Sequence, residues 1–198
     1  DVRPDIPVRL WRLPFQTGNR SDLSTVKVIS TYASPRLSYL TGHLHSGIDL
    51  APRAETASDT FVYPLAPGRV CSIHLGHPHI TIVVIHRLAD GSTLYTSYKH
   101  FQEIFVSPGQ AVTADTPLAR LYTRAEARVQ GGSYDHLHLE VRRSFDDFGV
   151  ASWASLSRSE LDSRFQDPLV FLRRVLAGGG GCIPSPNGPS CPGPAGMV

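Results

Sequence analysis

The sequence lacks two features that would assign it at once to a common class of protein. It carries no strong charge of one sign, because 19 Lys and Arg stand against 17 Asp and Glu, a formal net charge of +2 in 198 residues. Proteins that follow a nucleic-acid backbone normally present a strongly basic face, so we expect no nucleic-acid partner. The longest apolar stretch, from Ile80 to Ile85, is interrupted by Thr81. A membrane-spanning helix needs about 20 apolar residues, so we predict no transmembrane segment.

Cysteine is also scarce. Cys71, Cys182 and Cys191 are too few for a disulfide scaffold, although they allow one bridge beside one buried thiol. The sequence leaves open whether Cys182 and Cys191 are bridged. There is no Cys-x-x-Cys pair, which argues against a structural zinc site with thiolate ligands. The chain begins at Asp1 and not at Met, from which we expect a processed mature protein or a trimmed chain without its signal peptide.

Glycine and proline are concentrated at the C-terminal end. Residues 178–198 contain 7 Gly, 5 Pro and no charged residue. Such a segment cannot bury enough apolar surface to offset the entropy of ordering it, so we predict a flexible tail. We expect residues 26–177 to form one domain and residues 1–25 to form an irregular arm laid along it. The sequence leaves open whether this arm is inhibitory.

Short runs rich in β-branched residues predict a mainly β fold between Val26 and Arg143. Their spacing is typical of an antiparallel β-sandwich or half-barrel. The pair Asp90-Gly91 predicts a hairpin. Ser157 and Glu160 form a capping-box pattern and Pro168 stands where a helix can begin, so we expect one or two short C-terminal helices packed against the β core. The predicted strands are Val26–Ile29, Phe61–Leu65, Val70–Ile73, Ile80–His86, Thr93–Tyr98, Pro117–Tyr122 and His136–Val141.

All nine histidines lie between His43 and His138, and only some share a spacing that a metal could use. His45 and Asp49 are four residues apart, and Gly47 lets the backbone turn to bring their side chains together. Alone, such a pair is weak evidence for a site. Three other histidines surround Gly76 and Pro78 in a predicted loop, where we expect them to face solvent or substrate without a metal: His74, His77 and His79. We expect His86 to be structural, and His43 could compete with His45.

The run from His136 to Val141 alternates between polar and apolar residues. On a strand, this alternation points His136, His138 and Glu140 to one face and the intervening apolar residues to the core. One histidine and one carboxylate from the first segment, with one histidine from this strand, would give three protein ligands. Three ligands with a fourth position open for water is the arrangement of a catalytic zinc site.

Two segments then resemble a known family. Gly42–Pro52 (GHLHSGIDLAP) and Asp135–Arg142 (DHLHLEVR) are similar to the two signature motifs of the lysostaphin-type zinc endopeptidases, peptidoglycan hydrolases with the duplicated hybrid motif fold. Thr96–Phe101 (TSYKHF) is similar to the Tyr-x-His segment of that family. The resemblance extends from Val28 to Leu176, and several motifs in the right order are more specific than any one of them.

The resemblance implies His45, Asp49 and His138 as ligands of one Zn²⁺ per chain, with His136 and His100 as the catalytic pair. His136 would take the proton from a water molecule, and His100 would hydrogen-bond the oxyanion or position the water. It also implies peptide stems or cross-bridges of peptidoglycan as partners, and a secreted, periplasmic or cell-envelope location. We expect a monomer. The chain has no His-Glu-x-x-His run, the helical zinc motif of other metalloproteases.

Three segments depart from the family pattern: Ser58–Thr60, His74–Ile80 and the long charged turn Tyr122–Tyr134. We expect all three to form loops along the sides of the substrate groove. They would therefore not change the metal chemistry, but they leave the identity of the substrate undetermined. A D-alanine–diaminopimelate cross-link, a glycine bridge or a glycine-rich protein are the alternatives. The biological role, whether remodelling, lysis or predation, is open as well.

Two other classes of protein compete with this interpretation. A catalytically inactive lysostaphin-like domain could bind and regulate a cell-wall amidase, but such relatives typically lack one or more ligands, and here all are present. The segment Val106–Leu121 is similar to parts of biotinyl and lipoyl carrier domains. Those domains present a lysine at a hairpin tip, and neither Lys27 nor Lys99 is placed at one.

Overall fold

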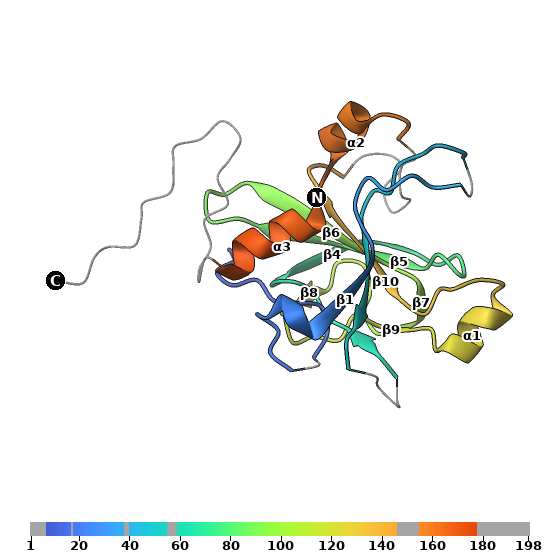
Figure 1. Cartoon of the computed structure of the whole chain (residues 1–198). Coiled ribbons are helices and arrows are strands. Elements are labelled where there is room, and N and C mark those ends of the chain that lie inside the picture. Colours follow the sequence, from blue (N-terminus) through green and yellow to red (C-terminus); the bar gives the residue numbers. More distant parts are fainter. Residues whose placement is uncertain (1–6, 17, 38–39, 55–58, 146–154, 178–198) are drawn as a thin grey trace.

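The computed structural model describes residues 7–16, 18–37, 40–54, 59–145 and 155–177. Two antiparallel sheets form its framework (Figure 1). The larger has the order β1-β2-β10-β6-β5-β4-β8, with β11 also paired to β10, and the smaller has the order β3-β9-β7. The mainly β prediction is therefore confirmed. The strands are β1 (Val26–Ser30), β2 (Ile48–Pro52), β3 (Phe61–Val62), β4 (Gly68–His74), β5 (Thr81–Arg87), β6 (Thr93–Lys99), β7 (Phe101–Ile104), β8 (Ala111–Val112), β9 (Ala119–Leu121), β10 (Leu137–Arg142) and β11 (Phe165–Gln166).

Strands β5, β6 and β10 form the centre of the larger sheet. All residues of β10 are buried, and so are all residues of β5 except the last. Apolar β-branched side chains suit such positions because they pack well on a pleated surface. Strands β5 and β6 pair as a hairpin around Gly91, whose φ of 84° requires little energy in glycine. The hairpin prediction is confirmed.

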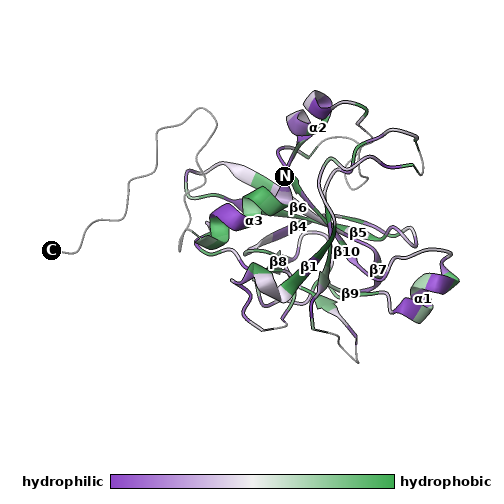
Figure 2. Cartoon of the chain, in the orientation of Figure 1, coloured by the Kyte–Doolittle hydropathy of each residue, from purple (hydrophilic) through white to green (hydrophobic). Residues whose placement is uncertain are grey.

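Two helices follow the β core, as predicted, and a third was not predicted. Ser157 caps α2 (Arg158–Arg164) by accepting a hydrogen bond from the backbone N–H of Glu160, and α3 (Pro168–Ala177) begins at the expected proline. The additional helix, α1 (Arg124–Val129), lies within the segment expected to be a turn and has a complete capping box made by Thr123 and Glu126. Figure 2 shows hydrophobic and hydrophilic residues side by side on α3.

The described part of the N-terminal segment, residues 7–16 and 18–25, contributes to the core although it contains no regular strand. Trp11, Leu13 and Phe15 are at most 2% exposed, and the ring of Trp11 packs edge-on against Phe171 of α3 at 4.9 Å. The guanidinium of Arg20 is buried and donates hydrogen bonds to the carbonyls of Leu13 and Ala114. The division into residues 1–25, 26–177 and 178–198 remains a prediction.

The C-terminal tail, with Cys182 and Cys191, lies outside the described residues. Cys71 is a half-buried thiol on β4, and burial raises its pKa to about 11. Among the described residues, no helix is long and apolar enough to cross a membrane.

The two sheets are joined at His100. Strand β6 ends at Lys99 in the larger sheet, and β7 begins at Phe101 in the smaller one. His100 has a φ of 78°, in the left-handed region that side chains with a Cβ rarely adopt. This conformation turns the chain through a sharp corner and holds the His100 side chain at the junction of the sheets.

Candidate metal centre

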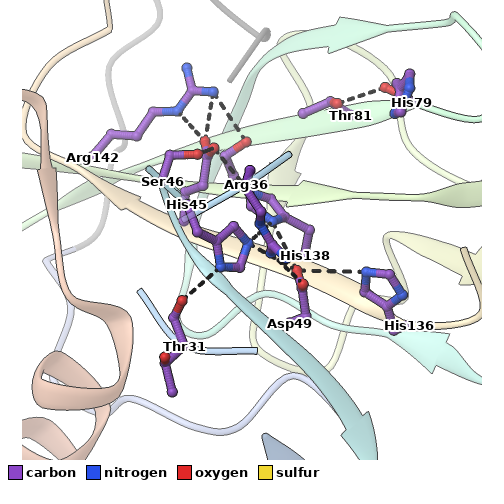
Figure 3. A network of polar contacts seen from close by, with 12 residues as sticks. Thr31, Arg36, His45, Ser46, Asp49, His79, Thr81, His136, His138 and Arg142 are labelled. Carbon is purple, nitrogen blue, oxygen red and sulfur yellow. Dashed lines mark hydrogen bonds and ion pairs between the residues drawn. The ribbon is translucent and has the colours of Figure 1, made fainter. Parts of the chain in front are cut away.

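Three side chains converge at one end of the larger sheet: His45, Asp49 and His138 (Figure 3). One potential ligand atom from each lies within 4.8 Å of the others. His45 Nε2 and His138 Nδ1 are 2.9 Å apart, and both are 3.1 Å from Asp49 Oδ1. The residues are 4%, 6% and 6% exposed. Among the described residues, this is the one group of histidine, cysteine or acidic side chains arranged to hold a metal ion.

The backbone brings these residues together in two ways. Strands β2 and β10 are antiparallel neighbours in which Asp49 pairs directly with His138. The loop that carries His45 passes close to β10 at Gly47, where a Cβ atom would overlap the carbonyl oxygen of Leu139. Glycine is required at this position because the loop and the strand are in backbone contact. The sequence prediction gave Gly47 a role in a turn, and its role here is close approach.

In His45 and His138, one ring nitrogen faces the cluster (the inner nitrogen) and the other points away from it (the outer nitrogen). Each outer nitrogen lies within hydrogen-bonding distance of an acceptor oxygen. His45 Nδ1 lies 2.9 Å from the carbonyl of Thr31, and His138 Nε2 lies 3.0 Å from Glu140 Oε1. Each outer nitrogen therefore carries a proton, and in the neutral ring, the form that binds a metal, each inner nitrogen presents a lone pair. Two acceptor nitrogens only 2.9 Å apart cannot hydrogen-bond each other. A cation between them would satisfy both lone pairs, so the residues fit a metal.

Asp49 completes the cluster with a negative charge. Its Oδ1 faces the histidines, whereas its Oδ2 accepts a hydrogen bond of 2.7 Å from Arg36 Nη2. Burial would raise the pKa of Asp49, but its contacts with the rings of His136, His138 and His45 outweigh burial and hold the pKa well below its usual range. The carboxylate is therefore ionised at neutral pH, as a metal ligand must be.

A buried network supports His138 from behind. Glu140 is 0% exposed and accepts hydrogen bonds from Ser46 Oγ at 2.6 Å and from Arg142 Nε at 2.8 Å, as well as from His138. Burial opposes the charge of Glu140, but Arg142 and His138 outweigh it and hold its pKa well below the ordinary value. Such a carboxylate fixes the tautomer and orientation of the histidine in front of it.

The predicted catalytic pair lies beside the cluster. His136 Nε2 is 3.6 Å from Asp49 Oδ1, and the rings of His136 and His100 are 5.0 Å apart. His100 Nδ1 lies 3.1 Å from the carbonyl of Pro78. Burial and the neighbouring imidazoles of His138 and His136 keep the pKa of His100 well below 6.5, so the ring is neutral at pH 7. The structure thus brings together all five residues that the resemblance indicated.

The remaining histidines lie outside the cluster. His86 is fully buried, and the half-buried His43 ring contacts the carbonyl of Leu40 through Nδ1. His74, His77 and His79 are exposed, as expected. The ring of His79 nevertheless packs 5.5 Å from His100 and 5.6 Å from Tyr134, and Tyr134 itself lies 5.1 Å from His100. Two segments that depart from the family pattern therefore meet beside His100.

Three functional features were missed by sequence reasoning: the Arg36 guanidinium, the Thr31 carbonyl and the supporting role of Glu140. Glu140 was placed on the face of the two histidines, and its spacing of two from His138 was the available signal. No pattern in the sequence linked Arg36 to Asp49, because they are 13 residues apart and their contact depends on the fold.

The fold and the cluster together define a mainly β protein with a candidate metal site made of two histidines and one carboxylate. Residues 43–149 match the model of peptidase family M23, which is more than half of the chain. The chain belongs to this family, and the family resemblance seen in its motifs is confirmed. A comparison with curated proteins found no match.

Solved structures with a similar fold include the catalytic domain of lysostaphin, an antimicrobial peptidase from Staphylococcus simulans. It is 20% identical, has a TM-score of 0.52, and the match covers 76% of this chain and 95% of that one. A zinc-containing peptidase from Vibrio cholerae is 26% identical with a TM-score of 0.46, over 67% of this chain. The chain spans only 36% of that peptidase. A chain of the SpoIIIAH–SpoIIQ complex is 22% identical, with a TM-score of 0.48 and coverage of 81% and 99%.

Proposed function

We propose that the protein is a zinc-dependent endopeptidase that hydrolyses peptide cross-links of bacterial peptidoglycan. His45, Asp49 and His138 would hold one zinc ion per chain. The observation that carries the proposal is the pair of inner nitrogens, His45 Nε2 and His138 Nδ1, which face each other as acceptors beside an ionised carboxylate. Two imidazoles and one carboxylate leave a coordination position open, as catalytic zinc sites do.

Zinc at this site would polarise the scissile carbonyl and lower the pKa of a water molecule to about 7. His136 would accept the proton of that water, and its position beside the cluster, with Nε2 3.6 Å from Asp49 Oδ1, supports this role. A histidine in this role contributes about 10²- to 10⁴-fold to the rate.

The hydrogen bonds that the His100 ring can still make limit its proposed role. Its Nδ1–H donates to the carbonyl of Pro78, so the neutral ring has only the Nε2 lone pair left. A lone pair accepts a hydrogen bond from water and cannot donate one to an oxyanion. Of the two roles considered for His100, the structure therefore favours positioning the water.

The proposed substrate indicates where in the cell the protein would act. Peptidoglycan stems and cross-bridges lie outside the cytoplasm, so we propose that the protein acts in a secreted or periplasmic setting at the cell envelope, as a monomer. The alternative, an inactive domain that regulates an amidase, has no support from the site, because His100 and His136 are both in place beside three intact candidate ligands.

The test uses purified peptidoglycan of the diaminopimelate and glycine-bridge chemotypes, with and without a chelator. New termini are identified by mass spectrometry. We expect release that stops with chelator, returns with zinc and is absent in His45→Ala. D-Alanine carboxyl ends would identify the cross-link as the substrate, and glycine ends would identify the bridge. Release that is unaffected by both the chelator and His45→Ala would refute the proposal, as would a purified protein that contains no zinc.

A further inference from the structure

Arg36 contacts the outer oxygen of the candidate ligand Asp49. Its Nη2 lies 2.7 Å from Asp49 Oδ2, and the side chains of Arg36 and Asp49 are 29% and 9% exposed. The other oxygen, Oδ1, is the one that faces His45 and His138 at 3.1 Å. His136 also lies on the Oδ1 side, at 3.6 Å. The two carboxylate oxygens therefore have separate partners, one guanidinium for Oδ2 and the imidazoles for Oδ1 (Figure 3).

The backbone of Arg36 belongs to the same hairpin as His45. The Arg36 N–H donates to the carbonyl of His43 at 2.8 Å, and Pro35 pairs with Leu44 in an antiparallel bridge. One step further along the hairpin, the His45 N–H donates to the carbonyl of Ser34 at 2.9 Å. The hairpin thus fixes the backbone of Arg36 relative to His45, and the Arg36 side chain in turn contacts the carboxylate of Asp49.

We propose that Arg36 is a positioning residue that restricts Asp49 to binding the metal through Oδ1 alone. A carboxylate can bind a metal through one oxygen or through both, and the charge-assisted hydrogen bond from Arg36 engages Oδ2. With Oδ2 withheld, the protein supplies three ligand atoms, and a position stays open for water or substrate. This inference rests on the proposed zinc site.

The first measurement is zinc affinity, by competition with a chromophoric chelator, for wild type, Arg36→Gln and Arg36→Met. Removing such an outer partner typically weakens metal binding by about 10- to 100-fold, which is the effect we expect for both variants. Arg36→Lys keeps a charged donor and should bind zinc more tightly than Arg36→Gln. Arg87→Gln is the control, because Arg87 is an exposed arginine at the far end of β5.

The second measurement is the visible absorption spectrum of the cobalt-substituted proteins, which reports coordination number independently of activity. We expect intense four-coordinate bands in wild type and Arg87→Gln. Arg36→Gln and Arg36→Met should give weaker, five-coordinate bands, because Asp49 Oδ2 becomes available to the metal. The two substitutions differ in polarity, so if one does not fold the other still tests the inference.

Wild-type affinity and an unchanged cobalt spectrum in Arg36→Gln or Arg36→Met would overturn the role of Arg36 and leave the zinc site standing. Failure of the wild-type protein itself to bind zinc or cobalt would overturn both this inference and the proposed function. The two failures are therefore distinguishable.

Discussion

Replacing His86 with glutamine should remove most of the pH dependence that this residue gives to stability. His86 lies inside β5, is 0% exposed, and contacts the carbonyl of Pro67 at 2.9 Å and the hydroxyl of Thr96 at 2.7 Å. Burial lowers its pKa from 6.5 to about 4. Glutamine offers one donor and one acceptor to the same partners without titrating.

The sign of the effect follows from proton uptake. The unfolded chain binds the proton as the pH falls through about 6.5, whereas the native protein binds it only near 4. Between these values the unfolded state holds more protons, so the free energy of unfolding decreases as the pH is lowered. The pKa difference corresponds to about 3 kcal/mol, of which about 2 kcal/mol should be lost between pH 7 and pH 4.5.

The assay is urea unfolding of the metal-free protein at pH 7 and pH 4.5, with chelator present so that metal binding does not contribute. The loss between the two pH values should be about 2 kcal/mol larger in wild type than in His86→Gln. Other buried histidines, such as His45 and His100, are common to both proteins and cancel in the difference. His74→Gln, a change in the exposed loop after β4, controls for the loss of one imidazole. Equal losses in wild type and His86→Gln would refute the reasoning.

Three further predictions concern the buried network, the N-terminal segment and the proton acceptor. In the metal-free protein, Glu140→Gln should cost about 3–5 kcal/mol of unfolding free energy because Arg142 loses its buried carboxylate. The control Glu103→Gln, at an exposed residue of β7, should cost under about 1 kcal/mol, and equal costs would contradict the prediction. Trp11→Ala should cost about 3–5 kcal/mol in urea unfolding, and a negligible cost would show that the N-terminal segment is dispensable to the fold. His136→Ala should keep one zinc per chain by atomic absorption while kcat on peptidoglycan falls about 10²- to 10⁴-fold; loss of the zinc would mean that His136 is a ligand.

Most of the longer strands were predicted from the sequence, but β2, which carries Asp49, was not, and neither were the short strands β7, β8 and β11. The strands from Thr81 to Arg87 and from Thr93 to Lys99 were found within one residue because β-branched runs and a hairpin signal mark them. Strands β8 and β11 have two residues each, too few to show an alternation. The helix α1 did have a signal, since Thr123 and Glu126 have the spacing of a capping box.

The inner shell of the candidate site could be predicted because its residues lie in short local patterns. His45 and Asp49 are four residues apart, and His136 and His138 are two residues apart, which is the side-chain repeat of a strand. The outer contacts depend on packing between distant segments. Arg36 reaches Asp49 through a hairpin, and the Tyr134 ring reaches His100 from the loop after α1. No local pattern in the sequence indicates either of these two contacts.

At residue 100, the backbone conformation that favours glycine is occupied by a histidine with a proposed catalytic role. On grounds of stability alone, a backbone with a φ of 78° would be occupied by glycine or asparagine. A histidine there costs the fold about 1–3 kcal/mol. The sequence carries this cost at a residue between the two sheets whose ring lies 6.2 Å from that of the candidate ligand His138. A stability-guided redesign of the protein would therefore replace His100 early, and would raise the melting temperature while removing the residue proposed to position water.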